Sequence, residues 1–132
     1  MSVFIDTSAM LAVLDADDRH HPEADAAWQE MLSSRAALVT TNNVLVETFA
    51  LVQHRLGLDA LKVFQEDVVP VLDIEWITES LHQSACEMLF LASKRRLSLV
   101  DCSSFAVMRI KGLKKAFAFG DHFREHRFVT IS

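Results

Sequence analysis

The sequence contains little of several residue types, and each shortage excludes a class of protein. Its 132 residues include only two cysteines, Cys86 and Cys102, which form no CxxC pair. Neither a disulfide scaffold nor a cysteine-based zinc site is therefore expected. No apolar run is long enough to span a membrane, and the first residues lack the basic and apolar segments of a secretion signal. We expect a reduced, cytoplasmic protein with no membrane segment.

Tyrosine is absent altogether, and no low-complexity segment or linker interrupts the chain. Without tyrosine, an aromatic platform for stacking nucleobases is not evident from the sequence. The chain is instead rich in apolar residues, which make up 51% of the total. At this length, such a composition predicts one globular domain, residues 1–132, with a substantial core.

Charge is distributed unevenly along the chain, whose net charge is −5. Residues 94–132 carry nine Lys or Arg and three acids, whereas residues 1–93 carry four Lys or Arg and fifteen acids. A basic C-terminal third suggests a polyanionic partner. The alternative is that these cations only complement helix C-termini and solvated loops, and the sequence leaves both interpretations open.

Short apolar segments alternate with longer segments of helical pattern. Such alternation predicts a parallel sheet covered by helices on both faces, a three-layer α/β/α fold. The segment 68–74 contains Pro70 and is expected near a sheet edge. Strands are expected at 3–5, 37–40, 68–74, 116–119 and 128–131, and helices at 8–14, 21–34, from the Thr40–Asn43 cap to Gly57, 58–66, 78–93 and 101–110, with a helical turn at 121–125.

Four acidic residues adjoin or interrupt apolar segments, where carboxylates are rare unless they are paired or bind metal. Asp6 ends the first strand and Asp121 follows the fourth. Glu47 lies in the second turn of the helix after the second strand, and Asp101 opens a helix. Because ligands of open α/β sheets bind beyond the carboxyl ends of the strands, all four can reach one cleft.

A cluster of carboxylates predicts a divalent cation, because like charges cannot all stay ionised without one. Oxygen ligands select Mg²⁺ or Mn²⁺ over zinc, and such an ion activates water and stabilises charge on a phosphodiester. The Thr7 and Ser8 hydroxyls can hold a metal-bound water or a carboxylate. Taken singly, Asp101 has a simpler explanation as an N-cap and Asp6 as a strand-end turn residue.

Four blocks of the chain resemble the PIN-domain ribonucleases and, within them, the small VapC-like toxins of type II toxin–antitoxin pairs. The blocks are 3–8, ending in Asp-Thr-Ser, 40–48 with Glu47, 97–108 with Asp101, and 116–123 continuing to Phe128. The resemblance implies an Mg²⁺- or Mn²⁺-dependent endoribonuclease, inhibited by a cognate antitoxin. It also implies that Asp6, Glu47 and Asp101 occupy the three principal acidic positions, with Thr7, Ser8 and Ser103 in support.

The chain departs from the family at the fourth acid, which usually lies two residues before the His of an Asp-x-His-Phe block. Gly120 occupies that position, and Asp121 lies one residue later. Either Asp121 substitutes as an outer ligand, or the second metal site is weakened, or Asp121 only caps the turn 121–125. The alternative function is accordingly a PIN-like RNA-binding module with weakened or lost catalysis. A haloacid-dehalogenase-like phosphatase would need a second acid where Ser8 stands.

The partners implied are an RNA substrate, an antitoxin and a second copy of the chain in a homodimer. Phosphate contacts are expected from Arg95, Arg96 and Arg109. The pairs His20/His21 and His122/His126 are interpreted as surface or RNA-contacting residues rather than metal ligands, since no third soft ligand accompanies them. An apolar stripe is a candidate partner surface, with core packing as the alternative: Leu51, Leu56, Leu58, Leu61 and Phe64.

Overall fold

The computed structural model describes residues 1–131, and its centre is an all-parallel sheet of five strands in the order β3-β2-β1-β4-β5. The strands are β1 (Ser2–Ile5), β2 (Ala37–Thr41), β3 (Asp73–Glu75), β4 (Lys115–Phe117) and β5 (Val129–Ile131).

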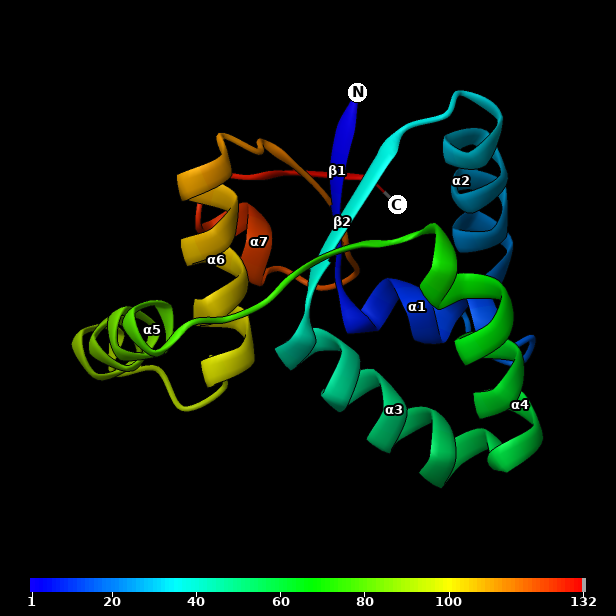
Figure 1. The fold of residues 1–132 in the computed structure, drawn as a ribbon, viewed down its shortest axis with the longest axis horizontal. Coiled ribbons are helices and arrows are strands. Elements are labelled where there is room, and N and C mark those ends of the chain that lie inside the picture. The colour runs from blue at the N-terminus through cyan, green and yellow to red at the C-terminus, as the bar shows by residue number, and fades with distance from the viewer. Residues whose placement is uncertain (132) are drawn as a thin grey trace.

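Helices cover both faces of this sheet (Figure 1): α5 and α6 lie on one side, and α1, α2 and α4 on the other. The expected three-layer α/β/α architecture is therefore confirmed. In the described residues, no helix combines the length and apolarity needed to cross a membrane. The helices are α1 (Thr7–Leu14), α2 (His21–Ser33), α3 (Asn42–Leu56), α4 (Leu58–Val63), α5 (Glu79–Ala92), α6 (Leu99–Lys111) and α7 (His122–Glu125).

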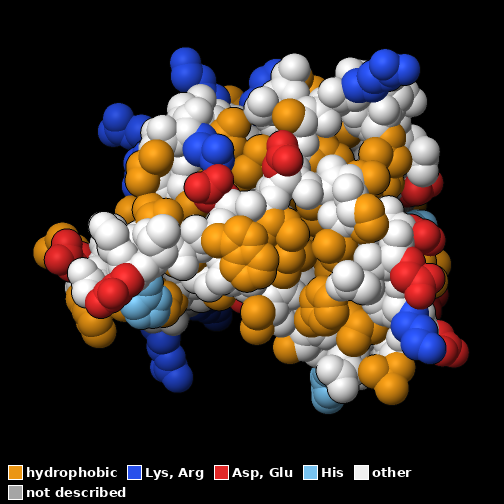
Figure 2. Space-filling view, in the orientation of Figure 1, with side chains coloured by type: hydrophobic (Ala, Val, Ile, Leu, Met, Phe, Trp, Pro, Cys, Tyr) orange, Lys and Arg blue, Asp and Glu red, His pale blue; other side chains and the backbone are white. Residues whose placement is uncertain are grey.

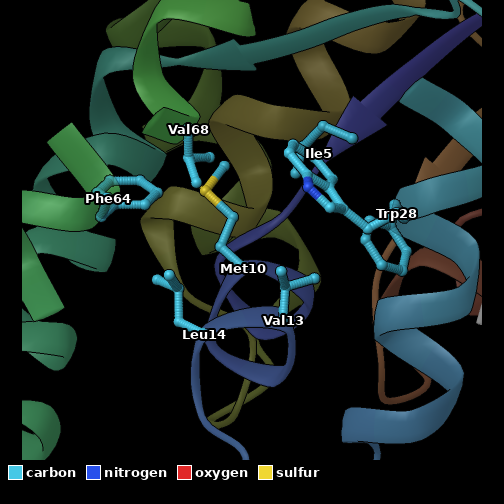
Figure 3. Close-up of a pocket in the computed structure, with 8 residues that line it drawn as sticks. Ile5, Met10, Val13, Leu14, Trp28, Phe64 and Val68 are labelled. Atoms are coloured by element: carbon cyan, nitrogen blue, oxygen red, sulfur yellow. The ribbon is translucent and has the colours of Figure 1, made fainter. Parts of the chain in front are cut away.

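The core forms around β1, whose Val3, Phe4 and Ile5 are fully buried. A strand covered on both faces needs a continuous apolar run rather than an alternating one, which is why these residues are consecutive. Figure 3 shows part of this core, where α1, α2 and the segment after α4 converge around a gap of about 10 Å³. Such a gap is about the size of one water and admits no substrate.

The expected strand 68–74 is only partly confirmed. Asp73 and Ile74 lie in β3, whereas before them α4 continues into a π-helical turn (Phe64–Val68) and a 3₁₀ turn (Val69–Val71). Phe64 and Val68 are both buried, and their four-residue separation places them on one helical face, so the apolar pattern here was helical. The strand that does form, β3, lies at the sheet edge, as expected for this part of the chain.

Candidate active site

The topology identifies one place where a ligand-binding crevice is expected. From β1, the chain proceeds through β2 to β3 on one side, and β4 and β5 lie on the other side of β1. The carboxyl ends of β1 and β4 therefore flank the switch point, where open α/β sheets bind ligands. Asp6 lies there, and its backbone N–H donates to the Phe117 carbonyl at 3.0 Å.

Asp6 is held by the residues that follow it. It is the N-cap of α1, in extended conformation, so its carboxylate turns back over the first turn of the helix. Oδ2 accepts from the Ser8 N–H at 3.2 Å and from the Ser8 hydroxyl at 2.7 Å. The Ser8 oxygen in turn accepts from the Phe119 N–H at 2.9 Å. A chain of hydrogen bonds thus fixes the Asp6 carboxylate to the loop after β4.

The electrostatics of Asp6 show that the other two principal acids are close by. Burial, together with the smaller effects of the Asp101 and Glu47 charges, raises the pKa of Asp6 to about 6, against the lowering effect of the Ser8 hydroxyl. Among residues 1–131, none of these three carboxylates forms an ion pair with Lys or Arg. A buried carboxylate whose charge is disfavoured by two neighbouring acids, with no Lys or Arg paired to any of the three, suits a metal ion.

Glu47 is placed by α3. Thr41 caps this helix by accepting from the Val44 N–H at 3.1 Å, which puts Glu47 in the second turn, half-buried. The next residue, Thr48, lies within 3.0 Å of the Thr7 hydroxyl, which also donates to the Val44 carbonyl at 3.3 Å. Thr7 therefore joins α1 to α3 within the core, and a role in holding a metal-bound water stays a prediction.

Asp101 is placed by α6, although not as its first residue. The helix begins at Leu99 with Ser98 as N-cap, and Asp101 is the third helical residue of a reciprocal capping box. Its N–H donates to the Ser98 hydroxyl at 3.0 Å, and its carboxylate accepts from the Ser98 N–H at 3.2 Å. The expectation that Asp101 opens the helix is thus corrected. Asn43 donates to Ser103 at 3.2 Å, so Ser103 joins α6 to α3.

A cleft of about 360 Å³ opens in front of Asp6 and Glu47. A second hollow, of about 410 Å³, lies between α3 and the start of α6 and shares Glu47 with the first. Glu47 therefore stands where the two hollows meet. The residues lining the first cleft are Asp6, Thr7, Ser8, Leu11, Asp18, His20, Glu47, Leu51, Arg55 and Phe119.

The donors fit a hard divalent cation, since all three are carboxylates. With the side chains as they lie, no three His, Cys, Asp or Glu groups within residues 1–131 gather closely enough to enclose an ion. An ion held by all three would require the side chain of Glu47 to rotate, because hydrogen bonds from Ser8 and Ser98 fix the carboxylates of Asp6 and Asp101.

The structure does not bring Asp121 to this group. Its side chain is 73% exposed and pairs with Arg124. It occupies the N-cap position of α7 without a capping hydrogen bond from its side chain, so the idea that it caps this turn is also wrong. Gly120 does have positive φ, +96°, a conformation natural to glycine, but this turn directs the chain into α7 without returning Asp121 to the cleft.

The cleft is also lined by three residues that the sequence did not indicate as part of a site: Arg55, Asp18 and Phe119. Arg55 had a readable signal, because it follows Glu47 at the i+8 position and so lies on the same face of α3. Of the three arginines chosen from the sequence, Arg109 lies over the Phe128 ring at 5.6 Å, in the last turn of α6. All three are exposed, and none lines the cleft: Arg95, Arg96 and Arg109.

A parallel α/β/α sheet with unpaired acids at its switch point is the arrangement of a nuclease of the PIN type. The PIN domain family model matches residues 3–129. The chain belongs to the PIN domain family, and the resemblance drawn from the sequence is confirmed.

Relatives extend along the whole chain. The chain is 35% identical over 130 residues to the 23S rRNA-specific endonuclease VapC20 of Mycobacterium tuberculosis, covering 98% of this chain and 97% of that protein. The crystal structure of that protein, described as a Sarcin-Ricin loop cleaving toxin, superposes with a TM-score of 0.86 over 96% of both chains. A VapC ribonuclease of Aquifex aeolicus is 22% identical over 97% of this chain and 94% of its own length.

Proposed function

We propose that this PIN-domain protein is a divalent-metal-dependent endoribonuclease, the toxin of a toxin–antitoxin pair, and that it cleaves ribosomal RNA of the large subunit in the cytoplasm. The observation that supports the metal dependence is the buried Asp6 carboxylate, on which the charges of both Asp101 and Glu47 act, while none of the three pairs with Lys or Arg within residues 1–131. The substrate follows from the relative that is 35% identical over nearly the full chain, a 23S rRNA-specific endonuclease.

The three acids share one role in this proposal, and neighbouring residues orient two of them. Asp6, Glu47 and Asp101 would hold the ion, which supplies an activated water and stabilises charge at the scissile phosphate. Ser8 orients the Asp6 carboxylate through its 2.7 Å hydrogen bond. The Ser98 N–H orients the Asp101 carboxylate at 3.2 Å. Because hydrogen bonds from Ser8 and Ser98 fix the carboxylates of Asp6 and Asp101, their positions are set before the substrate binds.

The test is cleavage of purified ribosomes and deproteinised 23S rRNA with Mg²⁺ or Mn²⁺, with EDTA as the control, and mapping of the cut by primer extension. We expect Asp6→Asn, Glu47→Gln and Asp101→Asn each to reduce the cleavage rate at least about a hundredfold, since each removes a ligand that positions the ion. Asp121→Asn is the matched control, an exposed acid outside the cleft. Full activity in any two of the three variants, or in EDTA, would contradict the assignment.

We further propose that the chain forms a homodimer that also binds an antitoxin. The stripe chosen from the sequence does not form one surface, because Phe64 is buried and Leu51 lines the acid cleft. Figure 2 shows hydrophobic side chains gathered over α3 and the segment after β3 instead. There Val46 and Trp76 are 70% and 67% exposed, and such a patch is typical of an interface.

Sedimentation velocity at tens of micromolar tests the dimer. The wild type should sediment as a dimer, and Trp76→Glu should shift it to monomer because a charge then enters the apolar contact. Val63→Glu, an exposed apolar position on α4 outside the patch, is the control. A wild-type monomer, or a dimer that Trp76→Glu leaves intact, would count against this surface.

A further inference from the structure

Two rings stack on the rim of the acid cleft. The centroids of His20 and Phe119 are 4.4 Å apart, with 13° between the ring planes. Both residues line the cleft that contains Asp6 and Glu47. Both also line an adjoining hollow of about 150 Å³ that extends toward Arg124. The pair therefore separates the acid cleft from the next hollow along the surface.

The pair has a fixed position relative to the acids. The Phe119 N–H donates to the Ser8 oxygen, whose hydroxyl donates to Asp6, so two hydrogen bonds link the base of the Phe119 side chain to the Asp6 carboxylate. The His20 N–H donates to Asp18 at 2.8 Å, and the Arg19 Nε donates to the His20 ring at 3.2 Å. Both rings are thus positioned by neighbours before any ligand binds.

Packing of the protein's own core does not account for the exposure of this pair. A parallel stack covers only one face of each ring, and the His20 side chain is 32% exposed. A second His–Phe stack offers a comparison: His126 lies on Phe105 at 4.3 Å and 18°. Phe105, however, is fully buried and also contacts Phe123 and Phe128. That pair lies within the core. Phe119 also contacts the buried Phe117 ring, with centroids 6.0 Å apart, but the His20–Phe119 pair borders a cleft.

We propose that the His20–Phe119 pair is a stacking platform for an unpaired nucleobase of the RNA substrate, next to the nucleotide whose phosphate enters the acid cleft. This inference rests on the proposed ribonuclease function. Proteins recognise splayed-out bases of RNA loops by stacking them on aromatic or His side chains. The other groups proposed to contact RNA in this cleft, the ion held by the acids and Arg55, act on phosphates. A stacking platform adds an attraction to the uncharged face of a base.

Binding is measured on Asp101→Asn protein, which leaves the RNA intact, by fluorescence anisotropy in Mg²⁺ buffer. The probes are labelled homopolymers of A, C, G or U of about 12 nucleotides, and versions with one abasic nucleotide at each position in turn. In this background, His20→Ala should weaken binding about 5- to 150-fold, the range for loss of one stacked base. His20→Phe keeps a ring without its nitrogens and should stay within about twofold of the parent. His126→Ala is the control, and thermal melts establish that each variant is folded.

The abasic probes separate stacking from a structural role. One abasic position should abolish the effect of His20→Ala, because the base that the ring contacts is already missing. Unchanged binding by His20→Ala, including the case in which the pair contacts the antitoxin instead, would overturn the proposal. So would a His20→Phe variant as weak as His20→Ala, or an equal loss on every abasic probe. None of these results bears on the ribonuclease function, which metal-dependent cleavage by the wild type would still support. If the Asp101→Asn parent binds no RNA, both the ribonuclease function and the stacking platform are contradicted.

Discussion

Removing the charge of Asp6 should stabilise the fold at neutral pH when no divalent ion is present. Burial, helped by the charges of Asp101 and Glu47, raises the pKa of Asp6 from 3.8 to about 6 in the folded protein. The folded state therefore binds this proton more tightly than the unfolded state does. The corresponding stability is fully present below pH 3.8 and is lost as the pH rises through about 6.

The magnitude follows from that difference in pKa. Each pH unit is worth about 1.4 kcal/mol, so ionised Asp6 lowers the free energy of unfolding by about 3 kcal/mol at pH 8 relative to its protonated form. Asp6→Asn removes the charge and keeps an oxygen that accepts from Ser8. The variant should thus exceed the wild type by about 2 to 3 kcal/mol at pH 8 and match it near pH 4.

Urea unfolding in EDTA between pH 4 and pH 8 measures this difference, because carboxylates that do not interact with Asp6 contribute equally in both proteins. Adding Mg²⁺ or Mn²⁺ should reduce the difference in the free energy of unfolding at pH 8, because the ion stabilises the wild type, which retains the Asp6 carboxylate, and not the variant. A difference between variant and wild type that stays constant across the pH range would refute the reasoning. A variant less stable at pH 8 would show that the Ser8 hydrogen bonds outweigh desolvation.

Other variants test separate parts of the structure. Arg55→Ala should weaken RNA binding and reduce the salt dependence of log K by about 1, since one phosphate contact is lost; an unchanged salt slope would exclude such a contact. Asp121→Asn should leave calorimetric Mn²⁺ binding unchanged, and a weaker affinity would restore Asp121 to the site. By urea unfolding, Ser98→Ala should cost about 1 kcal/mol through loss of the α6 cap, and Phe64→Ala about 4 kcal/mol through the cavity it creates; smaller losses would show that these sites relax.

The sequence predicts most of the sheet because β1 is buried on both faces and therefore has an unbroken apolar run. It predicts the location of Asp6 for the same reason, since a charged residue directly after such a run lies at a strand end. The secondary structure of the segment 64–71 was harder to predict, because a short apolar run fits either a strand or a helix. Only the spacing of Phe64 and Val68 distinguishes the two.

Contacts between segments far apart in the chain could not be predicted from the sequence. Nothing local places Phe119 beside His20, since their stacking depends on β4 lying next to β1. The position of Asp121 likewise depends on the backbone turn at Gly120 and on Arg124. The acidic side chain of Asp121 suggested a metal ligand, but its ion pair with Arg124 holds the carboxylate on the exposed surface.

The central place of β1 in the sheet has a consequence for synthesis of the chain. Its neighbour β4 comes from Lys115–Phe117, which follow β2 and β3 in the chain. Until those residues leave the ribosome, Asp6 lacks the carbonyl partner at Phe117, and Ser8 lacks the N–H of Phe119 that orients it. A nascent chain therefore cannot complete the arrangement around Asp6. The site around Asp6 is therefore completed only after the segment from Lys115 to Phe119 has been synthesised.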